Sequence, residues 1–307
     1  MDLGFEGGFA YMGEEYAPHA FKILGAYDND DRAIETYKLN LSGPAEVRDL
    51  TKVEMSDMPA AEVLFGGFPC QDFSSCGPKT GFEGKRGLLY KILEDYMRCH
   101  RPTLVVGENV PHLAKLQDGQ LLDTIVKDFE SAGYRFAVWT LYCPDYGLPQ
   151  NRTRLFIVGV RRDIYEKFGA PLAPEPSHFM SNRPIEWAID DLKRIDDETI
   201  PNQSQRFVAT KATKGAGQGG QKSIKGEVSY AVRANPKARV HFHYDLDRRL
   251  TVRECARLQS FPDEFVFPFS TSINILQVGN AVPPIVANVV AEELQGYIQK
   301  VRANKSL

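Results

Sequence analysis

An apolar run that ends in two glycines and a cysteine constrains the fold of this chain most. Residues 63–65 are Val-Leu-Phe, and Gly66-Gly67-Phe68-Pro69-Cys70-Gln71 follow directly. Such a run is typical of a buried parallel strand. In open α/β sheets, ligands bind at the carboxyl ends of the strands. We therefore expect Cys70 at a sheet edge, where a thiol held by the stiff Pro69 is placed for nucleophilic work.

Two further runs argue against the commoner fate of a free cysteine, which is burial in the core. The apolar run at 104–107 is followed by Glu108, and the run at 155–159 is preceded by Arg152 and Arg154. A thiol, a carboxylate and two guanidinium groups are thus expected to meet at one edge of the sheet.

Helical patterns alternate with strand-like runs over the first half of the chain. The expected helices are 2–13, 30–40, 88–98 and 121–132, and the expected strands are 23–27, 63–65, 104–107 and 155–159. This alternation predicts an α/β fold with a doubly wound, mostly parallel sheet.

The alternation stops after about residue 163, where four prolines, at 171, 174, 176 and 184, mark a domain boundary. Regular patterning resumes at Thr251, and residues 285–298 form a closing helix. We expect a catalytic domain of residues 1–182 plus 276–307, and a smaller irregular domain with a hinge at 183–275.

The cysteines argue for a reducing compartment. They are five in number, with no Cys-x-x-Cys pair, which is typical neither of a disulfide framework nor of a zinc site. The chain shows no signal peptide and no apolar run of membrane-spanning length. With 43% apolar residues it can build a full core, and we expect a cytoplasmic protein with no bound metal.

The distribution of charge predicts a phosphate-binding region, although the net charge is −3. Residues 202–239 carry eight basic residues against a single acid, Glu227. A basic segment on an acidic body is typical of nucleic-acid binding by one region. The alternative is a solvated charged loop. Interleaved glycines and glutamines favour DNA, because glycines allow close approach and glutamines read base edges.

These motifs resemble those of the cytosine-5 DNA methyltransferases found in bacterial restriction–modification systems and in phages. The resemblance covers nearly the whole chain, and the motifs stand in the order and at the spacing of that family. They are Pro69-Cys70-Gln71, Glu108-Asn109-Val110, Gln150-Asn151-Arg152-Thr153-Arg154, the segment 249–259 and the segment 277–284.

The resemblance implies a covalent mechanism on cytosine. Cys70 would add to C6 and make C5 nucleophilic, and Glu108 would hydrogen-bond N3 and the exocyclic amine in a protonated form. Arg154 would bind O2 and orient Glu108, and Arg152 would hold the cytosine or its phosphate. An ordinary buried ion pair is the alternative for Glu108 and Arg154.

The resemblance also implies that the target cytosine is flipped out of the duplex, because stacking shields C6. Residues 74–86 would form the loop that closes over the flipped base. The residues expected at the DNA are Gln71, Ser74, Lys222, Lys225, Arg233 and Arg239.

S-adenosylmethionine is the methyl donor that the resemblance implies. Asp28 matches the acid that binds the ribose hydroxyls, and Asp49 matches the acid that accepts from the adenine amine. Asn29 stands where the family often has an apolar residue, so its contact with adenine is expected to be weaker. The remaining expected cofactor residues are Pro69, Leu89, Asn280 and Val282.

The chain departs from the family at its beginning. The family starts with an apolar strand and a Phe-x-Gly-x-Gly-Gly loop, whereas this sequence opens at the helix that follows them, so we expect the first strand and the glycine loop to be missing. A mis-set start, a fragment and a degenerate homologue are the three explanations, and the survival of every later motif favours the first.

Two alternative functions stay open. An RNA-directed relative of the same fold would methylate tRNA, but Gln71 after the Pro-Cys pair favours DNA. A catalytically impaired DNA-binding homologue is supported only by the missing loop. The expected partner is double-stranded DNA, together with a cognate restriction endonuclease encoded nearby; we expect a monomer with no membrane association.

Overall fold

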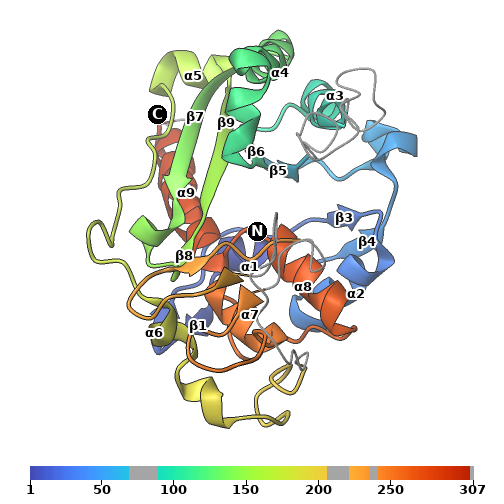
Figure 1. The fold of residues 1–307 in the computed structure, drawn as a ribbon. Helices are drawn as coiled ribbons and strands as arrows, with labels where there is room; N and C mark the ends of the chain where they lie inside the picture. Colours follow the sequence, from blue (N-terminus) through green and yellow to red (C-terminus); the bar gives the residue numbers. More distant parts are fainter. Residues whose placement is uncertain (69–88, 206–220, 235–240, 305–307) are drawn as a thin grey trace.

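A four-stranded mixed sheet lies at the centre of the computed structural model, which describes residues 1–68, 89–205, 221–234 and 241–304 (Figure 1). Its order is β5-β6-β9-β7. β5 (Val63–Gly67) pairs parallel with β6 (Leu104–Asn109), and β9 (Thr153–Arg161) lies antiparallel between β6 and β7 (Tyr134–Tyr142). Three of the four expected strands are confirmed here, the long edge strand β7 is additional, and the fourth expected strand, 23–27, is the shorter β3 (Ala26–Asp28) outside this sheet.

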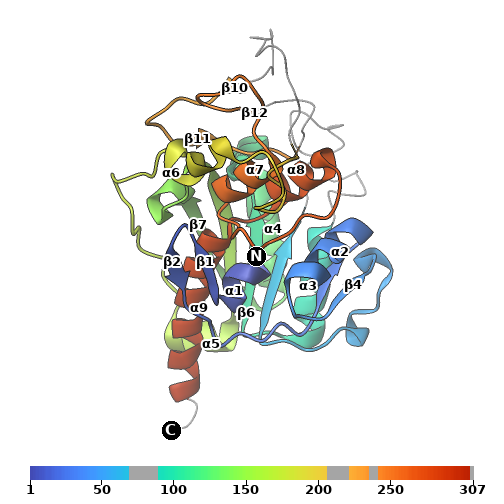
Figure 2. The same ribbon diagram turned by 90° about the horizontal axis from the view of Figure 1, so that it is seen from below.

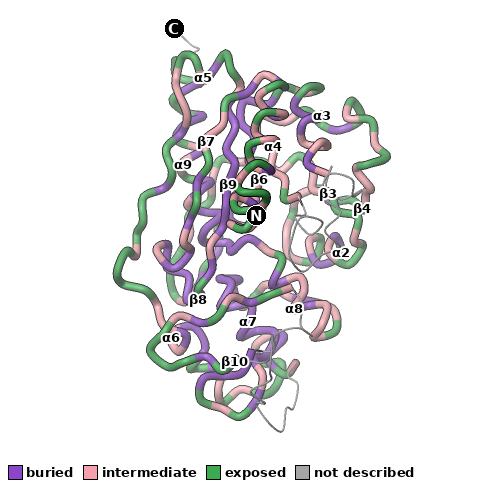
Figure 3. The backbone as a smooth tube through the Cα atoms, turned by 45° about the horizontal axis from the view of Figure 1, so that its top comes forward, coloured by how far each residue is buried: buried purple, intermediate pink, exposed green. Residues whose placement is uncertain are grey.

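Helices cover both faces of this sheet, because neighbouring residues of each strand point to opposite sides. On β6, Leu104 and Val106 pack with α9 (Pro284–Ala303), whereas Val105 packs with α3 (Tyr90–His100) and α4 (Gln120–Ser131). The strands are therefore buried on both sides, as their continuous apolar sequences predict. Figure 3 shows the buried course of β6 and β9 through the middle of the molecule.

The first strand–helix–strand unit of the chain forms a separate two-stranded sheet. β3 (Ala26–Asp28) pairs parallel with β4 (Ala45–Val47), with α2 (Asp31–Asn40) between them in sequence. Asp30 caps α2, since its side chain accepts a hydrogen bond from the amide of Arg32. Among the described residues, this pair makes no strand pairing with the four-stranded sheet.

The expectation of one helix over residues 2–13 is wrong. α1 (Asp2–Glu6) is short, and β1 (Phe9–Tyr11) and β2 (Glu14–Tyr16) form a hairpin after it. Gly7 and Gly8 end the helix because their φ angles, 64° and 69°, lie in the left-handed region that glycine adopts readily. α1 packs closely on α9, where a Cβ on Gly4 would lie 2.5 Å from the Cβ of Ala287.

The elements after the proline-rich stretch gather at one end of the molecule, opposite α5 (Arg162–Phe168) and the end of α9 (Figure 2). They surround a core of their own, which includes Ile185, Val252 and Leu258. The helices here are α6 (Ile185–Ile189), α7 (Val252–Leu258) and α8 (Thr271–Asn280), and the short strands are β10 (Gln221–Lys222), β11 (Ser229–Tyr230) and β12 (His241–Phe242). β11 pairs parallel with β8 (Gln150–Asn151), and β10 with β12.

The connections contain short 3-10 helices. They are η1 (Leu50–Lys52), η2 (Met55–Asp57), η5 (Pro111–Gly119), η6 (Cys143–Tyr146) and η7 (Asp191–Arg194). The C-terminal stretch Thr271–Ala303 is long and apolar enough to cross a membrane by length and composition alone. It is a core element here, because Val286, Val290 and Leu294 of α9 are fully buried.

Candidate active site

The strand register brings Glu108 and Arg154, two of the expected catalytic residues, to one edge of the sheet. Gly67, near the end of β5, lies opposite Glu108 on β6. Because β9 runs antiparallel to β6, it is the beginning of β9 that reaches this edge, and Glu108 lies opposite Phe156. The expected meeting of Glu108 with an arginine is confirmed for Arg154, which comes from an antiparallel strand.

Glu108 and Arg154 form a nearly buried ion pair. Nε of Arg154 lies 2.8 Å from Oε1 of Glu108, and the two side chains are 11% and 14% exposed. Burial raises the pKa of Glu108, and the opposing effect of Arg154 does not cancel it. A carboxyl group with a raised pKa can hold a proton and donate it, which is what a general acid needs.

Gly67 and Asn109 allow the end of β5 to lie close to Glu108. A Cβ on Gly67 would lie 3.6 Å from Oε2 of Glu108, so the backbone of β5 passes within reach of the carboxylate. The side chain of Asn109 donates to the carbonyl of Phe68 over 2.9 Å. Cys70 comes two residues after Phe68.

Cys70 and several other expected site residues lie outside the described residues. They are Pro69, Cys70, Gln71, Ser74 and Arg239, and the expected loop at 74–86 lies outside as well. The described cysteines offer a contrast, because burial raises the pKa of Cys143 to about 12 and also raises the pKa of Cys255. Such buried thiols are inert. Cys99 is exposed.

The guanidinium of Arg152 is bound by three backbone carbonyls. It donates to Val232 over 3.0 Å, to Gly279 over 2.8 Å and to Ala281 over 2.9 Å, and Arg152 is 4% exposed. The expected contact of Arg152 with cytosine or phosphate stays a prediction. What the structure shows is an arginine between β8 and β9 that binds two segments distant in sequence, at Val232 and at the end of α8.

The two acids expected at the cofactor lie at the ends of neighbouring parallel strands. Asp28 is the exposed last residue of β3, and Asp49 follows β4 by two residues. Asp49 caps η1, and hydrogen bonds from Thr51 and Lys52 hold its pKa at about 2. It is therefore ionised at neutral pH. Asn29, beside Asp28, is exposed.

A cleft of about 680 Å³ opens beside Asp49, between the 3-10 helices η1 and η2 on one side and α3 on the other. Leu50 and Leu89 contribute apolar surface to it. The other two expected cofactor residues lie at the end of α8: Asn280 is its exposed last residue, and Val282, two residues later, is buried against the central core. Among the described residues, no group of three or more His, Cys, Asp or Glu side chains is arranged to hold a metal ion.

The described part of the basic segment is exposed where the sequence predicts DNA contacts. Lys222, Lys225 and Arg233 all lie at the surface. Lys222 lies 3.6 Å from the carboxylate of Asp247, a pair too exposed to hold it strongly. The beginning of the segment differs, because Asn202 and Gln203 are buried and bind the backbone at Phe267 and Leu192.

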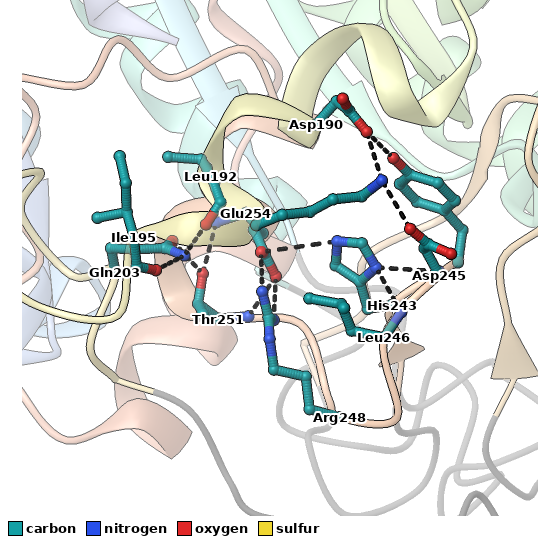
Figure 4. A network of polar contacts seen from close by, with 12 residues as sticks. Asp190, Leu192, Ile195, Gln203, His243, Asp245, Leu246, Arg248, Thr251 and Glu254 are labelled. Atoms are coloured by element: carbon teal, nitrogen blue, oxygen red, sulfur yellow. Dashed lines mark hydrogen bonds and ion pairs between the residues drawn. The ribbon is translucent and has the colours of Figure 1, made fainter.

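A buried polar network that the sequence does not reveal fixes the segment 243–254 (Figure 4). Arg248 donates two hydrogen bonds to Glu254, of 2.8 and 2.6 Å, and Thr251 donates its backbone N–H to the same carboxylate. Nδ1 of His243 accepts from the amides of Asp245 and Leu246, so its proton is on Nε2, which faces Glu254 at 3.9 Å. Burial lowers the pKa of His243 to about 4.

The same network reaches η7 through Lys193. Its ammonium lies 2.6 Å from Asp190 and 2.8 Å from Asp245, and the hydroxyl of Tyr244 also donates to Asp190. Only the spacing of Thr251 and Glu254, a capping-box pattern, could have indicated part of this cluster from the sequence.

Comparisons with known proteins agree with the fold and with the family that the motifs resemble. The family model described as C-5 cytosine-specific DNA methylase matches residues 3–296. Type II methyltransferase M.NlaX of Neisseria lactamica is 29% identical over 303 residues, covering 96% of this chain and 95% of that protein. Type II methyltransferase M1.ScrFI of Lactococcus lactis subsp. cremoris is 31% identical over 288 residues, covering 91% and 73%.

Solved structures share the fold at low identity. One, described as a DNA modification methyltransferase encoded within an E. coli prophage, has a TM-score of 0.67 at 20% identity and covers 91% of this chain and 94% of that chain. S. pombe Dnmt2 methyltransferase has a TM-score of 0.62 at 16% identity, with 91% of each chain covered.

The fold is that of an α/β methyltransferase, with a buried carboxyl–guanidinium pair at its strand ends. The chain belongs to the C-5 cytosine-specific DNA methylase family. It is an enzyme, a DNA (cytosine-5-)-methyltransferase, and DNA is its substrate.

Proposed function

We propose that the enzyme methylates a cytosine flipped out of a specific duplex DNA sequence, with Cys70 as the covalent nucleophile. The observation that carries this proposal is the pair of Glu108 and Arg154 at the end of β6, beside the end of β5 that leads to Cys70. The thiolate of Cys70 adds to C6 of the cytosine, and a C–S bond forms.

Glu108 supplies the proton that this addition requires. As the sulfur attacks C6, the electrons of the C5–C6 double bond move toward N3, and a protonated Glu108 donates there. Burial favours that protonated form, because it raises the pKa of the carboxyl group. Arg154 keeps the carboxyl group in place from 2.8 Å and directs positive charge at the developing charge on O2.

S-adenosylmethionine, when bound, supplies the methyl group that C5 receives, and loss of the C5 proton to solvent then breaks the C–S bond and releases the thiolate of Cys70. The residues present fit this donor, because Asp28 ends β3, Asp49 follows the neighbouring parallel strand β4, and Leu50, next to Asp49, lines a cleft of mixed polar and apolar character. Asp28 would accept from the ribose hydroxyls and Asp49 from the adenine amine, as acids do in related nucleotide folds. Asn29, Pro69, Leu89, Asn280 and Val282 complete the proposed binding set.

Residues 183–275 would form the recognition domain, with Gln71, Ser74, Lys222, Lys225, Arg233 and Arg239 at the DNA. The separate core around Ile185, Val252 and Leu258 supports this division. The relatives M.NlaX and M1.ScrFI are named Type II methyltransferases, which supports a role in restriction–modification beside a cognate endonuclease. We place the enzyme in the cytoplasm as a monomer.

Transfer of a labelled methyl group tests the proposal. The purified enzyme is incubated with labelled S-adenosylmethionine and either plasmid DNA or tRNA, and the products are digested to nucleosides. We expect label in 5-methyldeoxycytidine from DNA, and none with Cys70→Ser, because an alcohol is far less ionised than a thiol. Label that enters only tRNA would contradict the proposed substrate.

A further inference from the structure

Gly279, the penultimate residue of α8, is where two distant segments touch backbone to backbone. A Cβ on Gly279 would lie 2.4 Å from the amide nitrogen of Ala234 and 2.4 Å from the carbonyl carbon of Arg233. Real side chains do not approach that closely, so only glycine permits this contact. Its φ lies outside the left-handed region, and space alone therefore requires glycine.

Buried side chains also bind these two segments, residues 232–234 and the end of α8, to each other. Gln150 accepts a hydrogen bond of 2.9 Å from the amide of Val232, and it is fully buried. Arg152 donates to the carbonyl of Val232 and also to the carbonyls of Gly279 and Ala281. One guanidinium thus binds both segments at once.

Gln259 ties the same contact to α7. Its amide group donates to Val278 over 2.7 Å and to Ala281 over 3.2 Å, and its oxygen accepts from Gln150 over 2.9 Å. Gln150 and Gln259 are both 0% exposed. Close-packed interiors held by several buried hydrogen bonds shift as units and do not deform freely.

Each segment continues directly into an exposed side chain. Arg233, adjacent to Val232, is exposed and is a proposed DNA contact, and Asn280, adjacent to Gly279, is exposed and belongs to the proposed cofactor set. The position of the Arg233 backbone is therefore set by the turn that carries Asn280.

We propose that Gly279 is a positioning residue for DNA recognition: its missing side chain lets residues 232–234 rest on the last turn of α8, and this turn sets where Arg233 meets the DNA. This inference rests on the proposed function, in which Arg233 lies at the DNA and Asn280 at the methyl donor. Any side chain at position 279 would displace the segment and weaken discrimination between DNA sequences.

Discrimination between two duplexes tests the proposal. The sites that the wild-type enzyme methylates in plasmid DNA are first mapped by sequencing. Equilibrium affinity is then measured for a duplex with that site and for duplexes that each differ at one base pair, with S-adenosylhomocysteine present to prevent turnover. In Gly279→Ala we expect the affinity ratio to fall about tenfold at one position, as when an arginine–base contact is lost.

Two variants separate positioning from simple destabilisation. Gly296→Ala is the matched control, because this glycine lies in α9 with no neighbouring atom within 4 Å of the place that a Cβ would take, and it should keep the wild-type ratio. In Gln150→Met the side chain has nearly the same length but loses the hydrogen bond to Val232. This variant should therefore lower the DNA affinity ratio at the same base pair as Gly279→Ala. It serves as the second variant if Gly279→Ala does not fold.

The outcomes distinguish this inference from the proposed function. If the wild-type enzyme methylates and discriminates, while folded Gly279→Ala and Gln150→Met weaken binding equally for all duplexes, the inference is wrong and the proposed function stands. If the wild-type enzyme methylates no DNA, the proposed function fails, and the inference fails with it. The affinity of S-adenosylhomocysteine alone, measured by calorimetry, should change less than the DNA ratio.

Discussion

At the scale of single residues, the account depends on the protonation of Glu108. Glu108→Gln keeps the shape of the side chain but cannot transfer a proton. We expect turnover to fall by about 10²–10⁴, the range typical of lost general acid catalysis, with a smaller loss of DNA affinity. Single-turnover methylation and equilibrium DNA binding measure the two effects.

The control for this substitution is Glu166→Gln, an exposed glutamate of α5 at the far end of the molecule, which should behave as the wild type. The pH profile gives a second test. Because burial raises the pKa of Glu108, the wild-type rate should fall as pH rises through that pKa, and Glu108→Gln should lack this limb. Near-normal turnover of Glu108→Gln would show that the residue is structural.

His243 makes a separate prediction about stability. Its pKa is about 4 in the folded protein against an ordinary value near 6.5, so between these values only the unfolded chain binds the proton. The free energy of unfolding should therefore fall as pH is lowered from 6.5 to 4, by at most about 1.4 kcal/mol per pH unit from this group. Urea titrations across this pH range measure the slope.

His243→Asn keeps an acceptor near the amides of Asp245 and Leu246 but cannot titrate. The slope between pH 6.5 and 4 should be shallower in this variant than in the wild type, whereas His112→Gln, at an exposed position, should leave it unchanged. Equal slopes in the wild type and His243→Asn would show that the carboxylates of Glu254 and Asp245 offset burial, Arg248 and Lys193, which lower the pKa of His243.

At the scale of elements, the start of α7 gives the clearest test. Thr251 caps the helix, and together with Glu254 it completes a capping box. Thr251→Ala also removes a buried hydrogen bond of 2.8 Å to Gln203, so we expect a loss of about 1–2 kcal/mol in the free energy of unfolding. Ser270→Ala is the matched control, because Ser270 precedes α8 without a side-chain capping bond. Equal losses in the two variants would contradict the role of the cap.

The sequence predicts the elements best where one local signal dominates. α2, α3, α4 and α9 follow from apolar periodicity and, for α2, from the cap at Asp30, and the observed bounds lie close to those expected. The hairpin β1–β2 escapes prediction because its strands have three residues each, too short for a periodic signal. The direction of β9 cannot be predicted from local sequence either, because strand pairing depends on residues far apart in sequence.

Prediction of the site from the sequence is limited in the same way, to contacts that local patterns indicate. The pairing of Glu108 with Arg154 is predictable, since both lie in motifs beside strand-like runs. The bonds of Arg152 to Val232, Gly279 and Ala281 are not, because they join positions 80 to 129 residues apart. No pattern within one window of sequence reports such contacts.

At the scale of the whole molecule, the basic recognition end should carry the salt dependence of DNA binding. Replacing Lys222 and Lys225 together by glutamine should weaken binding to all sequences and reduce the slope of log affinity against log salt by roughly 0.9 per lost phosphate contact. Lys167→Gln with Lys300→Gln changes the charge equally at the opposite end of the molecule and should leave the slope unchanged (Figure 2). An unchanged slope in the Lys222 and Lys225 variant would remove these residues from the DNA interface.

Covalent trapping tests the central claim most directly. A duplex with 5-fluorocytosine at the methylated position is incubated with the enzyme and S-adenosylmethionine; fluorine at C5 cannot be eliminated, so the adduct persists. After digestion, mass spectrometry should find the nucleotide on the peptide that contains Cys70, and none with Cys70→Ser. An adduct at the exposed Cys99 or elsewhere, or an adduct that persists in Cys70→Ser, would contradict the account.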